Sequence, residues 1–443
     1  MSSASSSQWR TDRRSRATRS SLGFASLRGS AAGLVYTFPF VEMRARNVAR
    51  LPLRPSARNF RLMLVYQVSQ HSPLYWPYMF LFITSVRGLP ASDFGLLKSI
   101  YYFTVMGAEV PLGVVADRLG RRTTLFLGAL ANSAGCLLYA SGGSFAAFAA
   151  AELLFALTTA LQSGADSALL FDAYAADDRT HEFARAMGAL EATGLAGATA
   201  AFTLAGLVVT GDGDPTPTYV ASAFISLAGA AAAFALREPP RAPTVRVHRH
   251  VADALRDLVR APGLVATLAY GALVYAAIRA ANALVWNPVL GSAGVPVAAY
   301  GALTAVVTLL GAFTAWRADA WRRRTGTAVL AFAAAGSLAA MYMLLALAPG
   351  GAFAAPILVS HGFALGLTPV ILSDLLNRRI RVSERRATLL SFESLLQRGF
   401  YGVIVYAAAT ALGENSLSTV LVGFALLCVI PLALATRLRS DES

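Results

Sequence analysis

The sequence is poor in charged residues, and this shortage is the first constraint on what the protein can do. Only 14% of its 443 residues are charged and 56% are hydrophobic, whereas about a quarter of a soluble domain is charged. The net charge of +14 would suit nucleic-acid binding, but the charges stand at the ends of apolar stretches. We therefore expect segments that face a lipid bilayer, and no nucleic-acid partner.

Cysteines and catalytic motifs are scarce as well. Cys136 and Cys428 are the only cysteines, and both lie inside apolar stretches, which argues against a disulfide framework or a cysteine metal site. The sequence also lacks H-E-x-x-H, G-x-S-x-G and the phosphate-binding loop of nucleotide-driven pumps. We therefore expect no enzyme activity, no cofactor and no metal.

Long apolar stretches dominate what remains. A helix needs about 20 apolar residues to cross the hydrocarbon core of a membrane. Twelve stretches meet this requirement, some of them marginally, at 60–86, 92–115, 123–141, 145–171, 184–210, 217–236, 262–289, 297–317, 327–347, 353–375, 388–411 and 417–436. We expect an all-α integral membrane protein with twelve transmembrane helices.

The distribution of arginine supports this count. The connections after odd-numbered stretches hold a single basic residue, Arg87, whereas those after even-numbered stretches hold most of the other arginines beyond residue 58. Basic residues accumulate in cytoplasmic loops. We therefore expect a multi-pass protein of the cell (inner) membrane with both termini in the cytoplasm.

One charged pattern occurs twice, at an offset of 202 residues. Six pairs share this offset: Asp117 with Asp319, Arg121 with Arg323, Arg122 with Arg324, Asp172 with Asp374, Glu182 with Glu384, and Glu191 with Glu393. A common register of this kind predicts a tandem duplication of a membrane half. That architecture is typical of solute carriers rather than of enzymes.

The predicted domains follow from this duplication. Residues 58–236 and 262–437 are expected to form two pseudo-symmetric six-helix bundles. Residues 237–261 are expected to be a cytoplasmic linker, because Pro239, Pro240 and Pro243 stop the sixth helix. The Arg- and Ser-rich residues 1–57 are expected to be a disordered cytoplasmic tail, a mis-assigned start or a transit peptide, and 438–443 a second tail.

The connection after the second stretch resembles a family signature. The residues that fill the pattern G-x-x-x-D-R-x-G-R-R are Gly113, Asp117, Arg118, Gly120, Arg121 and Arg122. This pattern is typical of the major facilitator superfamily at this place, and the second copy is degenerate, with Ala315 at the first glycine. The resemblance covers residues 58–437 and implies the fold of that superfamily. Segments 109–113, 163–172 and 377–379 are similar to a branch of bacterial permeases.

The repeated charges are candidates for a gate. Gly113 is expected to let two helices approach closely, and Asp117 can accept hydrogen bonds from the arginines that follow it. Asp172 and Glu182 offer these arginines further partners, and the equivalent set is Asp319, Arg323, Arg324, Asp374 and Glu384. Such pairs can hold one side of a transporter shut and part when it opens. The alternative is that they only fix the topology.

Charges inside the stretches that do not recur are candidates for solute or proton binding. An ionised group at mid-membrane costs about 2.5–3.5 kcal/mol and usually faces protein or water. These residues are Lys98, Glu109, Glu152, Asp166, Arg279, His361 and Arg398. The resemblance implies that stretches one, four, seven and ten line a central cavity, to which it would add Gln70, Trp76, Tyr275 and Asn282. Such groups suit an amphiphilic solute, and core packing or lipid anchoring is the alternative for each aromatic ring.

A coupling proton is expected to bind Asp166 or Glu109, since a carboxylate in a low-dielectric site can hold a proton near neutral pH. Glu109 is also a candidate for the gate, because it lies two turns before Asp117. Lys98 is expected to extend toward water. Arg398 is expected to pair with Glu393 or with a carboxylate on a neighbouring helix.

Together these features predict a secondary active transporter that works by alternating access. The leading hypothesis is proton-linked efflux of a small organic or drug-like compound by a monomer. The alternative is proton-linked uptake of a small metabolite, such as an organic anion met by Arg279. Two motifs of proton-driven drug exporters are absent, because residues 159–163 read T-A-L-Q-S rather than R-x-x-Q-G, and residues 194–197 lack a Gly-Pro pair. A third hypothesis is a binding or sensing protein that does not transport, and the presence of gating charges in both halves argues against it.

Overall fold

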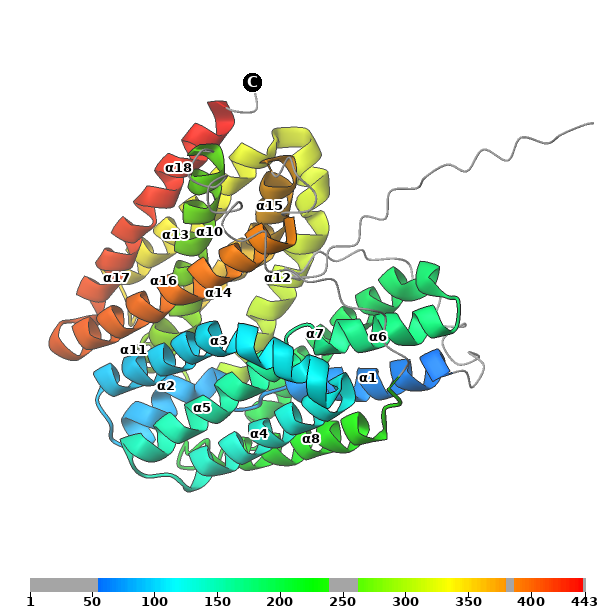
Figure 1. The fold of residues 1–443 in the computed structure, drawn as a ribbon. Helices are drawn as coiled ribbons and strands as arrows, with labels where there is room; N and C mark the ends of the chain where they lie inside the picture. Colours follow the sequence, from blue (N-terminus) through cyan, green and yellow to red (C-terminus); the bar gives the residue numbers. More distant parts are fainter. Residues whose placement is uncertain (1–54, 239–261, 380–385, 441–443) are drawn as a thin grey trace, which may run out of the picture. The chain divides into compact units, whose positions relative to one another are not determined.

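The computed structural model describes residues 55–238, 262–379 and 386–440 (Figure 1). Within these ranges the secondary structure is helical, without strands, which confirms the predicted all-α class. Most of the predicted tail 1–57 and linker 237–261 lies outside the described residues, and so does Glu384.

The first half of the chain contains the first six predicted stretches. The first stretch begins with α1 (Pro55–His71) and continues through η2 (Trp76–Tyr78), α2 (Met79–Leu81) and η3 (Phe82–Val86). The next helices are α3 (Ala91–Leu119), α4 (Arg121–Ser141), α5 (Phe145–Gln162), α6 (Ala165–Ala176), η4 (Thr180–Glu182), α7 (Phe183–Ala205) and α8 (Thr216–Ala235).

The second half contains the other six. The seventh stretch consists of α10 (Pro262–Ala280), η5 (Ala281–Val285) and α11 (Trp286–Ser292). The next helices are α12 (Ala299–Thr325), α13 (Thr327–Leu347), α14 (Ala354–Val359), α15 (His361–Arg379), α16 (Arg386–Glu414), α17 (Leu417–Leu427) and α18 (Val429–Ser440). Nine helical segments of the described part are long and apolar enough to cross a membrane.

Two helices continue past their predicted ends and stop at a glycine. We expected the second and eighth stretches to end at residues 115 and 317, but α3 reaches Leu119 and α12 reaches Thr325. Each ends at a glycine with positive φ, +96° at Gly120 and +87° at Gly326. Glycine adopts this conformation without steric cost and commonly ends a helix. We call the end of the bundles that holds these two turns the arginine-rich end.

The helices of stretches one, four, seven and ten are interrupted, as is that of stretch twelve at Cys428. The break between α5 and α6 falls at Gly164, whose φ is +73°. A π-helical turn, η5, separates α10 from α11, and Ser360 separates α14 from α15. Discontinuous helices in transporters occur where the backbone lines a solute path. These breaks are therefore consistent with the cavity-lining role expected of the four stretches.

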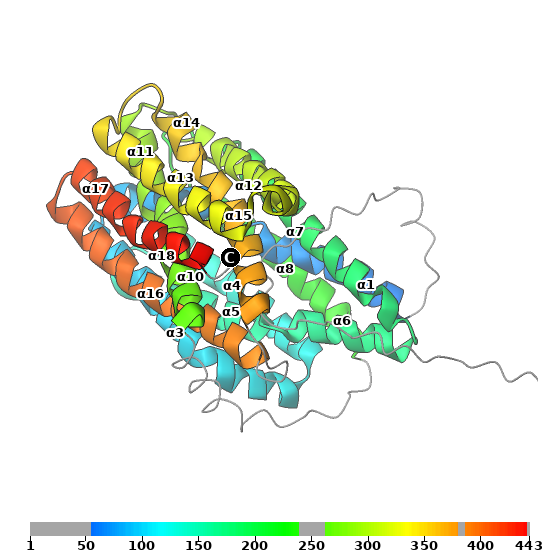
Figure 2. The same cartoon turned by 90° about the horizontal axis from the view of Figure 1, so that it is seen from above.

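The two halves meet along two helix pairs, α3 with α16 and α7 with α12 (Figures 1 and 2). Glycine brings the backbones together at the end opposite to the arginine-rich one. A Cβ added to Gly95 would lie 2.5 Å from Cβ of Ala409, and one added to Gly301 would lie 2.2 Å from the carbonyl oxygen of Phe202. Such approaches exclude any larger residue and hold the halves together at that end.

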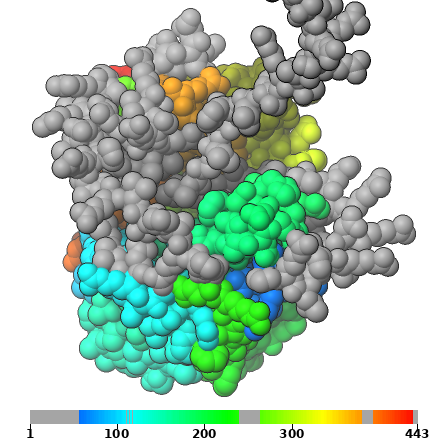
Figure 3. All heavy atoms as spheres, turned by 45° about the vertical axis from the view of Figure 1, so that its right-hand side comes forward, coloured from blue at the N-terminus to red at the C-terminus, as the bar shows by residue number. Residues whose placement is uncertain are grey.

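Within the first half, α4 packs against α5 and α8, and α1 packs against α7 and α8. Figure 3 shows α8, in green, beside α1, in blue. Gly113 does not take part in such packing, because a Cβ added to it would meet nothing within 4 Å. The expectation that Gly113 allows a close helix approach is therefore wrong for this conformation, and Gly95 and Gly301 serve that purpose instead.

Candidate functional site

The turn between α3 and α4 connects three helices by charge. The Arg121 guanidinium forms an ion pair with the carboxylate of Asp172 on α6. The backbone N–H of Arg121 donates to Oε1 of Glu238 at 2.8 Å. The guanidinium carbon of Arg122 lies 4.8 Å from the ring centre of Phe234 on α8. Arg118 is exposed, and the side chain of Asp117 lies outside the described residues.

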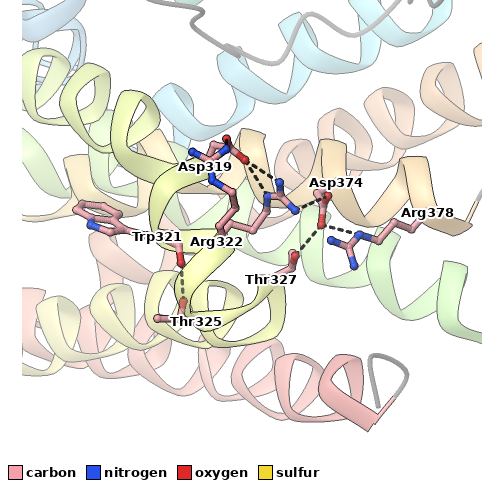
Figure 4. Close-up of polar contacts among 8 residues, drawn as sticks. Asp319, Trp321, Arg322, Thr325, Thr327, Asp374 and Arg378 are labelled. Carbon is pink, nitrogen blue, oxygen red and sulfur yellow. Dashed lines mark hydrogen bonds and ion pairs between the residues drawn. The ribbon is translucent and has the colours of Figure 1, made fainter.

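The second copy of this turn uses a different arginine (Figure 4). Arg322, rather than the expected Arg323, bridges two carboxylates: its Nη2 lies 2.7 Å from Oδ1 of Asp319 and its Nη1 3.3 Å from Oδ1 of Asp374. Arg378 reaches Oδ2 of Asp374 at 3.0 Å. Arg323 pairs with Asp319, and Arg324 is exposed.

The difference between the two copies arises from where each helix ends. Gly120 and Gly326 are 206 residues apart, so the second turn comes four residues, or about one helical turn, later than the 202-residue charge register. Thr327 therefore begins α13 as Arg121 begins α4. Its hydroxyl donates to Oδ2 of Asp374 at 2.6 Å, in place of an arginine.

Two of the other repeated acids, Glu182 and Glu393, have local partners. Glu182 accepts two hydrogen bonds from Arg179, with Nη2–Oε2 and Nε–Oε1 distances of 2.6 and 2.7 Å. These hydrogen bonds lower the pKa of the Glu182 carboxyl below its ordinary value. Glu393 is 3% exposed and accepts from Nε2 of Gln397 at 2.5 Å. Glu191 is half-buried on α7.

Four of the seven non-repeating charges gather along the contact of α3 with α5 and α16. Lys98, the only lysine in the chain, lies 2.5 Å from Oε1 of Glu152, which also accepts from the hydroxyl of Tyr139. Lys98 and Glu152 are 7% and 1% exposed. The expectation that Lys98 extends toward water is wrong, because a buried carboxylate on α5 holds its ammonium group.

Further along the same helix contact, the hydroxyl groups of Tyr101 and Thr159 lie 2.8 Å apart. Closer to the arginine-rich end, Glu109 accepts from the hydroxyl of Ser163 at 2.8 Å. Its other oxygen, Oε2, lies 2.6 Å from Nη1 of Arg398 on α16. Of the two partners expected for Arg398, the structure has the carboxylate on a neighbouring helix. This ion pair joins the two halves.

His361 and Asn282 link two of the interrupted stretches. His361 is fully buried at the start of α15, and its Nε2 lies 2.9 Å from Oδ1 of Asn282 in η5. Its Nδ1 lies 2.6 Å from the carbonyl oxygen of Leu358. The ring of Trp286 packs edge-to-face against the imidazole of His361, with the ring centres 6.0 Å apart. Both imidazole nitrogens therefore have protein partners.

Gln70 belongs to an amide network in the first half. Its Oε1 accepts from Nε2 of Gln162 at 3.1 Å and from Nδ2 of Asn132 at 3.3 Å. Its Nε2 donates to the hydroxyl of Ser226 at 3.2 Å. The network joins α1, α4, α5 and α8. It provides donors and acceptors within the bundle that could also meet a polar solute.

Asp166 lies one residue into α6, directly after the break at Gly164. It is half-buried, and its Oδ1 accepts the backbone N–H of Ser167 at 2.6 Å. Trp76 is also half-buried and packs against the hydrophobic core from η2. Both residues retain some exposed surface, in contrast to His361.

Arg279 lies at the end of α10 among tyrosines. Its guanidinium carbon is 5.2 Å from the ring centre of Tyr275. The hydroxyl of Tyr401 donates to the backbone carbonyl of Arg279 at 3.5 Å. Arg279 and Tyr275 are both half-buried. The site combines a cation within a membrane-spanning helix with flat aromatic surfaces.

Comparison with known families decides the identity of the fold. The model of the Major Facilitator Superfamily matches residues 72–402. The chain belongs to this superfamily. No curated protein matches the chain.

Solved structures of superfamily transporters have the same fold. A mutant of the nucleoside transporter NupG has a TM-score of 0.71 at 14% identity, over 86% of this chain and 99% of that chain. A bacterial homologue of the human lysosomal transporter Spinster, inward-facing and unoccupied, has a TM-score of 0.67 at 16% identity, over 89% and 99%. A POT family transporter in complex with a thioalcohol-conjugated peptide has 0.66 at 10% identity, over 87% and 96%. At these identities the likeness concerns the fold alone.

The sequence did not indicate several residues of this superfamily member that contact the candidate site residues or one another. These residues are uncharged or occupy positions without a repeat: Tyr101, Tyr102, Tyr139, Thr159, Ser163, Arg322, Thr327 and Tyr401. A signal existed for Arg322, since it stands beside the repeated Arg323. No charge pattern indicates the tyrosines, because a ring's neighbours depend on how its helix is rotated.

Proposed function

We propose that this superfamily member is a secondary active transporter that moves a small organic solute by alternating access and is driven by protons. We further propose that it exports the solute. It would act as a monomer in the cell (inner) membrane with both termini in the cytoplasm. The arginine distribution between connections supports this orientation.

The observation that carries the proposal is the ion pair between Glu109 and Arg398. Of the ion pairs formed among the described residues, this one joins the two halves, whereas the others lie within one half. Alternating access moves one half against the other. The pair therefore lies where motion of the halves changes the distance between two charges.

Protonation of Glu109 would couple a proton to this motion. A protonated carboxyl is neutral and loses most of its attraction for the guanidinium of Arg398. Both side chains are less than one-third exposed, at 27% and 21%, so water screens their interaction only in part. Proton binding would weaken the contact between halves, and proton release would restore it. Asp166, half-buried beside the break in stretch four, is the second candidate for proton binding.

Uptake of a small organic anion is the second candidate function. Arg279 supports the anionic solute of this candidate, because a guanidinium inside a membrane-spanning helix can attract an anion. An anion could also be exported, so this observation bears on the solute rather than on the direction.

The test is solute-dependent proton movement in proteoliposomes. Purified protein is reconstituted with a pH-sensitive dye inside, and a library of organic compounds is added under an imposed pH gradient. We expect one compound class to move protons, Glu109→Gln to abolish the movement, and Asp166→Asn to reduce it. Glu414→Gln is the matched control, since Glu414 is exposed at the end of α16.

Two outcomes would contradict the proposal. Solute flux that ignores the pH gradient in the wild type and in Glu109→Gln would exclude proton coupling through this pair. Specific binding without flux for every compound would point to a sensing protein. The direction follows from comparing initial rates with the solute inside and outside the vesicle.

A further inference from the structure

Four tyrosines from both halves form a continuous array beside Arg279. We call Tyr101, Tyr102, Tyr275 and Tyr401 the tyrosine cluster. The rings of Tyr101 and Tyr102 meet edge-to-face with centres 4.9 Å apart. Tyr102 meets Tyr401 in the same way at 4.8 Å, and Tyr401 meets Tyr275 at 6.2 Å. α3 belongs to the first half, and α10 and α16 to the second, so the cluster crosses the interface.

The cluster has two ends that are not fully buried. Tyr102 and Tyr401 are 7% and 1% exposed, whereas Tyr101 and Tyr275 are half-buried. The buried pair keeps the array in place, and the half-buried rings retain surface that a ligand can cover. Aromatic rings of this kind can take up a further aromatic group in an offset-stacked or edge-to-face contact.

Arg279 provides the charge of this site. Its guanidinium carbon lies 5.2 Å from the ring centre of Tyr275, a distance typical of cation–π contacts. The N–H groups of a guanidinium lie in one plane, and a pair of them can bind the two oxygens of a carboxylate in a bidentate manner. A cation in a membrane-spanning helix also favours an anionic partner.

We infer that Arg279 and the tyrosine cluster bind a planar aromatic carboxylate as the solute. This inference rests on the proposed transport function and names the solute class of that site. The carboxylate meets the guanidinium edge, and the aromatic ring of the solute packs against the tyrosines. Because both halves contribute rings, binding couples the solute to the interface that moves during transport.

Four small probes test charge and planarity separately. Benzoate is a planar anion, benzamide its neutral analogue, benzylammonium a planar cation, and cyclohexanecarboxylate a non-planar anion. Binding to purified protein is measured by calorimetry. We expect benzoate to bind most tightly and benzamide to bind about tenfold to a hundredfold more weakly, since hydrogen bonds between charged groups contribute about 1.5–3 kcal/mol. Cyclohexanecarboxylate should be weaker than benzoate because it cannot stack.

Variants identify the residues responsible. Arg279→Gln should lower benzoate affinity to that of benzamide, Tyr275→Leu should lower it, and Tyr275→Phe should keep it, because the ring rather than the hydroxyl group makes the contact. Arg317→Gln is the matched control. Arg317 also stacks on an aromatic ring, with its guanidinium carbon 5.6 Å from the ring centre of Trp316, but on α12 and away from the cluster. The Arg317→Gln variant should bind benzoate as tightly as the wild type does.

The probe series on the wild type remains decisive even if a variant fails to fold. Equal affinity for benzoate and benzamide, or tighter binding of benzylammonium, would overturn the inference. Transport of a neutral or cationic compound that Arg279→Gln leaves unchanged would also overturn it, while leaving the proposed function intact. The absence of flux for all compounds would instead count against the proposed function.

Discussion

Loss of the negative charge on Glu152 should destabilise the first half strongly. Glu152→Gln removes the partner of Lys98, whose ammonium lies 2.5 Å from the carboxylate and whose side chain is 9% exposed. The remaining neighbours of the ammonium are the sulfur of Met79 at 3.6 Å and the ring of Phe94, with its centre at 5.5 Å. These groups can only partly replace a carboxylate, so the variant leaves a buried, poorly compensated cation.

The magnitude follows from burial. Removing one partner of a buried ion pair destabilises a protein by about 3–5 kcal/mol, whereas replacing both charges by neutral groups of similar volume is often neutral. We therefore expect Glu152→Gln to lower the unfolding temperature by several degrees. The double variant Lys98→Met with Glu152→Gln should recover most of the loss, since the introduced glutamine can still accept the hydrogen bond from Tyr139.

The two cysteines provide the assay. Cys136 and Cys428 are buried, at 0% and 1% exposure, so a thiol-reactive fluorescent dye labels them only as the protein unfolds. Heating detergent-solubilised protein with the dye gives an unfolding temperature for each variant. If Glu152→Gln matches the wild type, or the double variant is no more stable than the single one, the reasoning from an uncompensated cation is refuted.

Three further predictions use the same measurement. Arg322→Gln should lower the unfolding temperature, because Arg322 bridges two carboxylates on α12 and α15, while Arg324→Gln should not, because Arg324 is exposed. Gly206→Ala should be destabilising, since its Cβ would lie 2.0 Å from a backbone carbonyl oxygen of the other half, whereas Gly113→Ala should be tolerated, with nothing within 4 Å. The ion pair of Glu182 lowers the pKa of its carboxyl, so its contribution is complete above the unfolded value of about 4.3 and is lost as the pH falls through the lowered folded value. Glu182→Gln should therefore cost less than about 1 kcal/mol at pH 7, since the pair is partly exposed, and this difference should vanish in acid. In acid, unfolding is followed by tryptophan fluorescence, because a protonated thiol does not react with the dye.

The sequence by itself determined the class, the helical stretches and the family of this protein. A long apolar segment that crosses the hydrocarbon core must satisfy its backbone hydrogen bonds internally, which an α-helix does. Hydropathy along the sequence is therefore sufficient to locate such helices. The signature around Asp117 and Arg121 was sufficient to indicate the superfamily, which the family comparison confirmed. Among the charges that do not recur, Glu152 and His361 are buried in the structure.

Only the tertiary structure decided which charges meet. The 202-residue register led us to expect Arg323 opposite Asp374. However, α12 ends about one helical turn later than this register implies, so Arg322 forms the ion pair with Asp374 and the hydroxyl of Thr327 donates a hydrogen bond to the same carboxylate. Likewise, Arg398 pairs with Glu109, which precedes it by 289 residues. A side chain's partner depends on where its helix ends and how the helix is rotated. Both are set by packing between helices that are distant in the chain, which no local sequence pattern encodes.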